Sequence, residues 1–219
     1  MGKLSSQPNQ RKLLCEFLRL FYEKGWVSGT GGGICTVGKG GEIIMAPTGV
    51  HKERVEPHHL FTVHPSSGDI LRFPKDKSLR LSECSPIFCS LVKNRNAGSV
   101  MHSHALSAVL AGDLALGNAH VVIEGFEMLK GIKGVNNHDK HLVPVIFNTP
   151  QESELLQQIH DILKNEAYQD IFAILVRDHG AYIWGDNIWE AKRHAEVYHF
   201  LFEATVSRVK NLPSSLKNL

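Results

Sequence analysis

The sequence predicts an α/β domain in which helices pack on a mixed, largely antiparallel sheet. Segments with the apolar spacing of a helix alternate with short apolar runs of strand length. A glycine-rich turn joins two of the short runs, and such a turn favours an antiparallel hairpin. A continuous apolar run at residues 171–176 is typical of a strand at the centre of a sheet, covered on both faces.

The N-terminal part predicts one helix and one hairpin. Apolar residues recur at helical spacing over residues 10–25, and Gly25 ends this amphipathic helix. A dense glycine turn follows at residues 29–33. Two strands, 34–37 and 42–46, are then expected to pair through the glycine-rich turn between them.

Helices and strands alternate through the rest of the chain. The second helix can be capped by Ser82 or Ser85, and Pro86 is acceptable in its first turn. Helices are predicted over residues 84–92, 106–116, 152–164 and 188–209. Strands are predicted over residues 99–101, 121–124, 142–147, 171–176 and 181–184.

Length and charge limit the classes of function. A chain of 219 residues fits one domain, residues 1–219, better than two small ones. The 24 basic and 22 acidic residues leave a net charge of +2, which argues against nucleic acid as a partner. The longest apolar stretch is broken by Gly112 and Asp113, so the sequence predicts no membrane span.

The cysteines and the N-terminus favour a cytoplasmic protein. The four cysteines lack both the C-x-x-C spacing of a zinc ribbon and the density of a disulfide framework. The first ten residues are polar, without the apolar stretch of a secretory signal. We therefore expect a reducing compartment.

Histidine is the unusual residue of this sequence, with 13 copies. His102 and His104 end a predicted strand two positions apart, and alternation along a strand puts both on one face. Chance alone gives about one such pair at this histidine content, so the spacing is weak evidence by itself. A third histidine, His179, follows another buried strand and precedes Gly180. Three imidazoles suit a zinc ion with one open coordination position, and we predict such a site.

Two glycine-containing segments are candidate anion sites. The turn at residues 29–33 lacks the spacing of dinucleotide-binding or P-loop motifs, but its backbone N–H groups can approach an anion. Thr48-Gly49 is a second candidate of the same kind. Glu83, Glu124 and Glu127 are candidate bases for a metal-assisted reaction, and spacing alone does not choose among them. The residues alone thus indicate a metal-dependent hydrolase or lyase for a small, phosphorylated molecule.

The ordered motifs of the chain resemble the class II aldolase/adducin family. The resemblance runs from about residue 13 to residue 209 and depends on the order and spacing of all the motifs together. They are GTGGGI (29–34), APTGV (46–50), SECSP (82–86), HSH (102–104), GFEMLKGI (125–132) and RDHGAYIWG (177–185). The resemblance implies a three-layer α/β/α domain with a central mixed sheet.

The same resemblance implies roles for individual residues. The zinc ligands fall on His102, His104 and His179, and an active-site cysteine that lines the substrate pocket falls on Cys84. The phosphate-binding positions fall on Gly31, Gly32, Thr48, Gly49 and Ser82, with Lys52 nearby.

Within the family, the stretch around Glu127 and the Cys84-Ser-Pro sequence point to dehydratases of methionine salvage. These enzymes act on a phosphorylated keto sugar, and their acid/base glutamate falls on Glu127. Glu83 matches a metal-proximal glutamate of the aldolases, so the choice of base between Glu83 and Glu127 stays open. The alternatives are a zinc-dependent sugar-phosphate aldolase or epimerase and a non-catalytic, adducin-like interaction module. The family also implies a homotetramer with sites near subunit boundaries.

Overall fold

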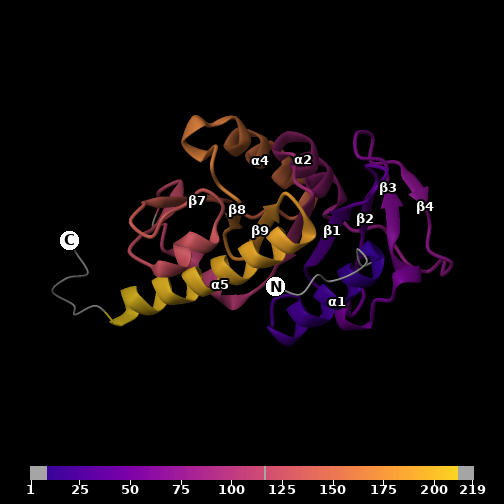
Figure 1. Ribbon diagram of the computed structural model, residues 1–219, viewed down its shortest axis with the longest axis horizontal. Helices are drawn as coiled ribbons and strands as arrows, with labels where there is room; N and C mark the ends of the chain where they lie inside the picture. The colour runs from indigo at the N-terminus through magenta and orange to yellow at the C-terminus, as the bar shows by residue number, and fades with distance from the viewer. Residues whose placement is uncertain (1–8, 116, 212–219) are drawn as a thin grey trace, which may run out of the picture.

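The computed structural model describes residues 9–115 and 117–211, which form a nine-stranded sheet with helices on both faces. The strand order across the sheet is β4-β3-β2-β1-β5-β9-β8-β7-β6. Of the pairings within it, β7 with β8 is parallel and the others are antiparallel. The predicted mixed, largely antiparallel sheet is thus confirmed (Figure 1).

The first helix and hairpin match the prediction. Helix α1 (Gln10–Glu23) begins after Asn9, whose side chain accepts from the backbone N–H of Arg11 at 3.0 Å. It ends before Gly25, which has a positive φ of 73°. Strands β1 (Gly33–Val37) and β2 (Ile43–Met45) pair antiparallel, as expected.

Two strands at the β4 edge were not predicted from the sequence. β3 (Phe61–Val63) pairs with β2, and β4 (Ile70–Arg72) pairs with β3. Each has three residues, too few to show the alternation by which a strand is recognised.

The other predicted elements are present, with bounds shifted by a few residues. The helices are α2 (Ser85–Arg95), α3 (Leu106–Asp113), α4 (Leu155–Lys164) and α5 (Ile188–Asn211). The strands are β5 (Ser99–Ser103), β6 (His120–Ile123), β7 (His141–Ile146), β8 (Ala173–Val176) and β9 (Gly180–Gly185).

Three local predictions need correction. The helix expected up to residue 116 ends at Asp113, and residue 116 itself lies outside the described part of the chain. The helix expected from residue 152 begins with a 3-10 turn, Glu152–Glu154. The run expected at the sheet centre forms β8, which is interior and fully buried, but β5 holds the middle position.

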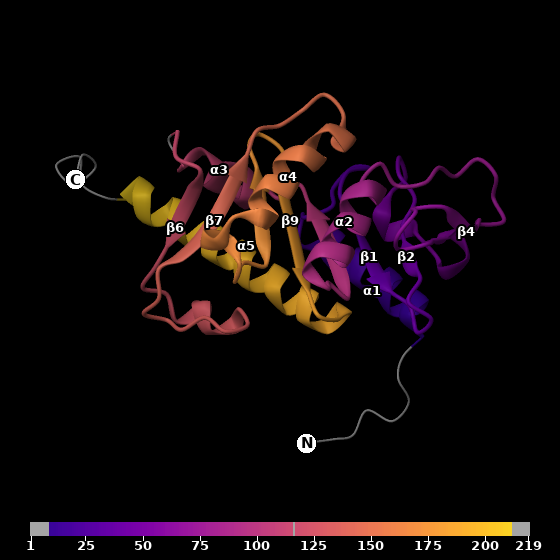
Figure 2. The ribbon, with the colours of Figure 1, turned by 90° about the horizontal axis from the view of Figure 1, so that it is seen from above.

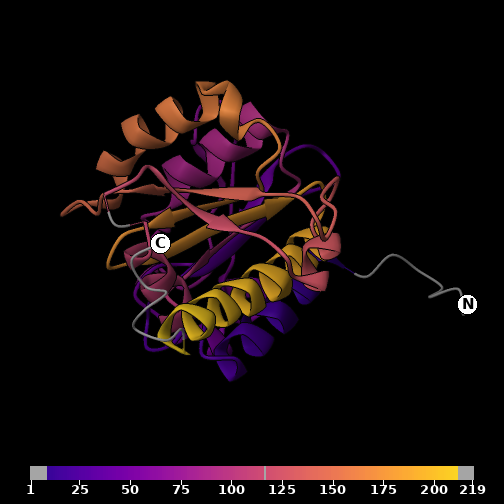
Figure 3. The same ribbon diagram turned by 90° about the vertical axis from the view of Figure 1, so that its left-hand side faces the viewer.

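The helices form one layer on each face of the sheet. Residues of α1, α3 and α5 share one buried apolar cluster, and residues of α2 and α4 share another on the opposite face. Figure 3 shows this three-layer arrangement nearly end-on, with α2 and α4 above the strands and α1 and α5 below. No helix in the described ranges is both long and apolar enough to cross a membrane.

The topology places the C-terminal ends of three strands on the same side of the sheet, where the strands end. β7 and β8 are parallel, and β5 runs in their direction because both β5 and β8 pair antiparallel with β9. The segments that follow β5, β7 and β8 therefore leave the sheet at the same end of the strands. The loop after β7 is visible at the top of Figure 2. β1 starts at this same end of the strands, since Gly33 pairs with His102.

Candidate metal centre

Three histidines lie together at this end of the strands. His102 is the penultimate residue of β5, and His104 follows the strand. His179 lies in the tight turn between β8 and β9, next to Asp178, which has a positive φ of 54°. His179 lies 75 positions after His104 in the sequence, and the pairing of neighbouring strands brings the two side chains together.

The three imidazoles point their Nε2 atoms at one point. The Nε2–Nε2 distances are 2.9 Å between His102 and His104, 3.1 Å between His104 and His179, and 3.2 Å between His102 and His179. Ligand nitrogens about 2.0–2.1 Å from a tetrahedral zinc ion lie about 3.3 Å apart. The donor set therefore fits a divalent metal ion closely.

Hydrogen bonds at the opposite ring nitrogens favour the ligand tautomer. His102 Nδ1 lies 3.2 Å from the carbonyl oxygen of Ala181, which can only accept. His179 Nδ1 lies 3.0 Å from Oδ1 of Asn148. A proton on Nδ1 leaves the Nε2 lone pair free to bind a metal ion. Hydrogen-bond partners of metal-binding histidines usually fix this tautomer and the orientation of the ring.

A carboxylate that the sequence analysis did not single out completes the cluster. Glu152 Oε1 lies 3.0 Å from His102 Nε2 and 3.4 Å from His179 Nε2. One donor atom from each of Glu152 and the three histidines lies within 4.8 Å of all the others. Glu152 follows β7 closely. Its position just after a predicted strand is the sequence feature that could have pointed to it.

A buried tyrosine and cysteine lie behind this carboxylate. The Tyr182 hydroxyl donates to Glu152 Oε2 at 2.6 Å, and its ring stacks on His102 with centroids 4.2 Å apart. Burial, and next the Glu152 charge, raise the pKa of the Cys84 thiol well above its usual value. Cys84 therefore stays protonated beside the Glu152 carboxylate.

The predicted glycine turn packs directly on the histidines. A Cβ at Gly31 would lie 2.4 Å from His104 Nδ1, and a Cβ at Gly32 would lie 2.8 Å from the carbonyl oxygen of His102. Only glycine allows the turn to approach this closely without displacing either histidine. Gly31 and Gly32 thus lie beside the cluster.

A buried histidine, His199, holds the backbone between His102 and His104. Ser103 Oγ lies 2.7 Å from His199 Nε2, and it also accepts from the backbone N–H of Ala105. His199 stacks on Trp26 at 4.0 Å, and the Trp26 carbonyl accepts from the His104 N–H at 2.8 Å. These contacts fix the turn that aims both histidines at the same point.

Lys52 connects the two predicted anion loops. Its buried Nζ donates to the carbonyl of Thr30 at 2.7 Å and to that of Val50 at 3.1 Å. Burial lowers the pKa of this ammonium group. Thr48 forms an isolated bridge with Arg80, and Gly49 has a positive φ of 68°. Lys52 thus places a cationic side chain between the glycine turn and the segment that contains Thr48 and Gly49.

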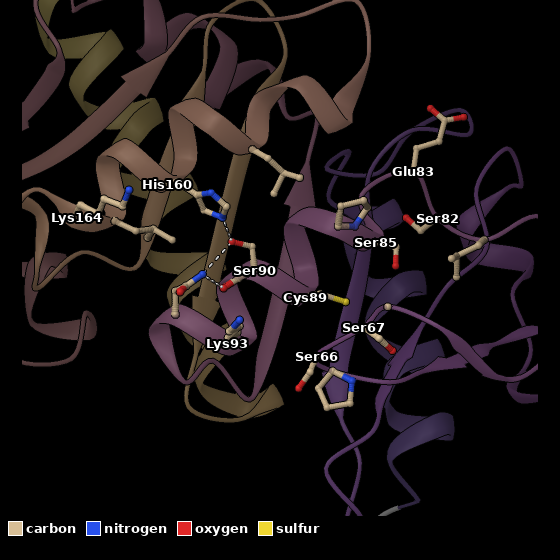
Figure 4. A pocket seen from close by; sticks show the side chains of 17 residues that line it. Ser66, Ser67, Ser82, Glu83, Ser85, Cys89, Ser90, Lys93, His160 and Lys164 are labelled. Atoms are coloured by element: carbon tan, nitrogen blue, oxygen red, sulfur yellow. Dashed lines mark hydrogen bonds between the residues drawn. The ribbon is translucent and has the colours of Figure 1, made fainter.

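Ser82 and Glu83 lie at the rim of a separate cavity of about 860 Å³, between α2, α4 and the β3–β4 turn. Figure 4 shows the Glu83 carboxylate pointing away from the other labelled side chains. Ser82 Oγ accepts from the backbone N–H of Cys84 at 3.3 Å, which ties it to the start of α2. The residues lining this cavity do not include His102, His104 or His179.

Glu127 lies at the other end of the strands. It begins a 3-10 turn, Glu127–Gly131, in the connection from β6 to β7, before β7 starts. Its side chain is 72% exposed and binds Lys130 and Asn137, both at 2.7 Å. Within one chain the structure does not bring Glu127 to the histidines, so its role as the base stays a prediction.

The electrostatics of the cluster suit a cation. Partial desolvation lowers the pKa of His104 to about 3, and the neighbouring His102 and His179 add to this effect. Burial opposes ionisation of Glu152, yet its close contacts with His102 and His179 hold the pKa of its carboxyl below the usual range. At neutral pH the cluster therefore offers a neutral imidazole and an ionised carboxylate, the forms that bind metals.

Comparisons with known proteins agree with this architecture. Residues 12–206 match the family described as class II aldolase and adducin N-terminal domain. Methylthioribulose-1-phosphate dehydratase from Gallus gallus is 42% identical over 202 residues, which cover 90% of this chain and 82% of the relative. The protein of the same name from Schizosaccharomyces pombe is 39% identical over 204 residues, covering 90% and 88%.

A solved structure shares the fold at low sequence identity. An L-fuculose 1-phosphate aldolase superposes with a TM-score of 0.73 at 15% identity, covering 99% of this chain and 96% of the other. Identity at this level supports the fold alone, whereas the relatives near 40% identity also bear on the chemistry.

Proposed function

This chain belongs to the class II aldolase and adducin family, and from that premise we propose that it is a lyase acting on 5-methylthioribulose 1-phosphate. The reaction removes water and gives 2,3-diketo-5-methylthiopentyl 1-phosphate, a step of methionine salvage. The observation that supports this function best is the convergence of three imidazole Nε2 atoms within 3.2 Å of one another.

We propose that His102, His104 and His179 hold a zinc ion. A divalent metal at this position supplies a Lewis acid that polarises the substrate carbonyl at C2. The nearby thiol of Cys84, protonated and buried, offers an apolar contact for the methylthio group.

The glycine turn and the Thr48-Gly49 segment would hold the substrate phosphate. Gly31 and Gly32 pack against His104 and His102, and Lys52 bonds to both loops. Ser82, which lies at the start of α2, is the third proposed phosphate contact. Anchoring the phosphate fixes the distance of C3 and C4 from the catalytic groups.

The proton transfers need a carboxylate base. It removes the proton from C3, the C4 hydroxyl leaves with a proton as water, and the resulting enol returns to a ketone. We propose Glu127 for this role, with Glu83 as the alternative. Since Glu127 lies at the far end of the strands, it can act only on the site of a neighbouring copy. A homotetramer with sites at subunit boundaries would meet this requirement.

A cytoplasmic location agrees with the thiol chemistry of the chain. All four cysteines are free, and a thiol beside the metal cluster is part of the proposed site.

The test is a dehydration assay on purified protein. We expect product from 5-methylthioribulose 1-phosphate, loss of turnover on chelation, and recovery on adding Zn²⁺. His102→Ala should lose both bound metal and turnover, because it removes one of the three proposed imidazole ligands. Full activity of a metal-free His102→Ala protein would refute the proposal.

The fold also supports a sugar-phosphate aldolase or epimerase, which would use the same ligands. Offering L-fuculose 1-phosphate or ribulose 5-phosphate beside methylthioribulose 1-phosphate separates these activities. A non-catalytic, adducin-like role would leave all three substrates unchanged.

A further inference from the structure

We propose that Glu152 is a fourth metal ligand in the resting enzyme and that Tyr182 positions it. This inference rests on the proposed metal centre of His102, His104 and His179. It concerns a residue for which neither the motif resemblance nor the spacing of the sequence suggested a role.

The distances place Glu152 within the ligand set. Its Oε1 atom lies 3.0 Å from Nε2 of His102 and 3.4 Å from Nε2 of His179, and the histidine nitrogens are separated by 2.9–3.2 Å. The donor atoms of all four residues lie within 4.8 Å of one another, so one four-coordinate ion could bind them together.

The donor and acceptor pattern points the same way. Nδ1 of His102 faces a carbonyl oxygen and Nδ1 of His179 faces an amide oxygen, so each carries the ring proton there. When these two rings carry their single proton on Nδ1, their Nε2 atoms direct lone pairs toward the Glu152 oxygen. Lone pairs at about 3 Å repel, and one cation between them satisfies all of these atoms together.

The second oxygen of Glu152 is held from behind. Tyr182 is fully buried and donates to Glu152 Oε2 at 2.6 Å, so the carboxylate presents Oε1 to the histidines. The tyrosine ring also stacks on His102 with an interplanar angle of 9°. One buried side chain thus orients two members of the cluster, as second-shell residues of metal sites do.

A consequence follows for the open coordination position. With Glu152 bound, four protein groups surround the ion, whereas a three-histidine site leaves a position for substrate. Substrate must therefore replace the Glu152 oxygen or enlarge the coordination shell. The carboxylate would stay close in either case, since Tyr182 anchors its other oxygen.

The competing explanation is an ion pair between Glu152 and a protonated histidine. The two explanations differ in what Glu152→Gln does to metal binding. A lost ligand weakens it, whereas a lost ion-pair partner frees the histidine and leaves metal affinity equal or higher.

The experiment measures metal binding by wild type, Glu152→Gln, Tyr182→Phe and a control, Glu154→Gln. Glu154 lies in the same 3-10 turn, is exposed, and is two residues from Glu152. The readouts are the Zn²⁺ dissociation constant, by chelator competition, and the visible spectrum of Co²⁺-loaded protein, which reports coordination number. Circular dichroism verifies that each variant is folded.

We expect Glu152→Gln to weaken Zn²⁺ binding by roughly 100-fold and to change the Co²⁺ spectrum. Tyr182→Phe should weaken binding by roughly 10-fold, and Glu154→Gln should match wild type. Wild-type affinity and an unchanged spectrum in Glu152→Gln would overturn the inference while leaving the three-histidine site intact. Absence of saturable metal binding in wild type would instead overturn the metal centre itself.

Discussion

Replacing Gly31 with alanine tests how tightly the glycine turn constrains the metal centre. The added Cβ would lie 2.4 Å from His104 Nδ1 and 2.8 Å from its Cε1. An ordinary contact needs about 3.5 Å, so the His104 ring must move by about 1 Å. The ring cannot make this shift and keep its Nε2 atom 2.9 Å from that of His102.

A displacement of about 1 Å in a catalytic site can cost on the order of 100-fold in rate. We therefore expect Gly31→Ala to weaken Zn²⁺ binding by roughly 10- to 100-fold and to lower kcat/KM by a similar factor. The unfolding free energy should change by less than about 1 kcal/mol, because Gly31 lies in a loop and His104 is exposed at the protein surface.

Gly33→Ala is the matched control for this experiment. Gly33 is two residues away and lies in β1, where a Cβ would meet only Lys52 Cε, at 3.9 Å. Chelator competition and urea denaturation on both variants separate a local effect from a general one. If Gly31→Ala and Gly33→Ala bind Zn²⁺ equally well, the turn does not hold His104 in place, and the reasoning is wrong.

Two further predictions concern stability and assembly. Burial lowers the pKa of His141 to about 4, so the folded state favours the neutral imidazole. The unfolded state takes up a proton on His141 at a higher pH, so the free energy of unfolding should fall by roughly 2 kcal/mol from pH 7 to pH 5. Urea denaturation at both pH values tests this, and His141→Gln should show a smaller pH dependence; an equal dependence would contradict the assignment. For assembly, mixing inactive His102→Ala with inactive Glu127→Gln under exchange of subunits should restore part of the activity. Failure to restore any activity in verified hybrid oligomers would place the base within one chain.

The fold could be predicted because its signals are local. The helical spacing of α1 and α5, the hairpin of β1 and β2, and the apolar run that forms β8 each lie within one short segment. β3 and β4 lacked such a signal, because each is three residues long and β4 is largely exposed at the sheet edge.

The histidine cluster could be predicted in part for the same reason. His102 and His104 share a strand face, which spacing alone reveals. His179 joins them because β8 and β5 both flank β9, a pairing that no local pattern specifies. The prediction drew on its position after a buried strand and on the resemblance of the motifs.

Glu152 was missed because its position depends on topology. It lies six residues beyond the end of β7, and only the parallel pairing of β7 with β8 brings that end to the histidines. The carboxylates near the other motifs are Glu83, Glu124 and Glu127, and Glu152 lies outside those motifs. A short loop after a strand, ending in a carboxylate at a helix start, is too common a pattern to identify a ligand.

The two glutamates at opposite ends of the strands are suited to different tasks. Glu152 faces the histidines, is only 15% exposed on its side chain, and has its second oxygen fixed by Tyr182. A carboxylate held in this way suits a ligand better than a base that must take up a proton and release it. Glu127 is 72% exposed and bonded to surface groups, so it can exchange protons readily once a second copy brings it to the site. One chain therefore supplies every proposed metal ligand, whereas the proposed acid/base group requires the contact between two chains.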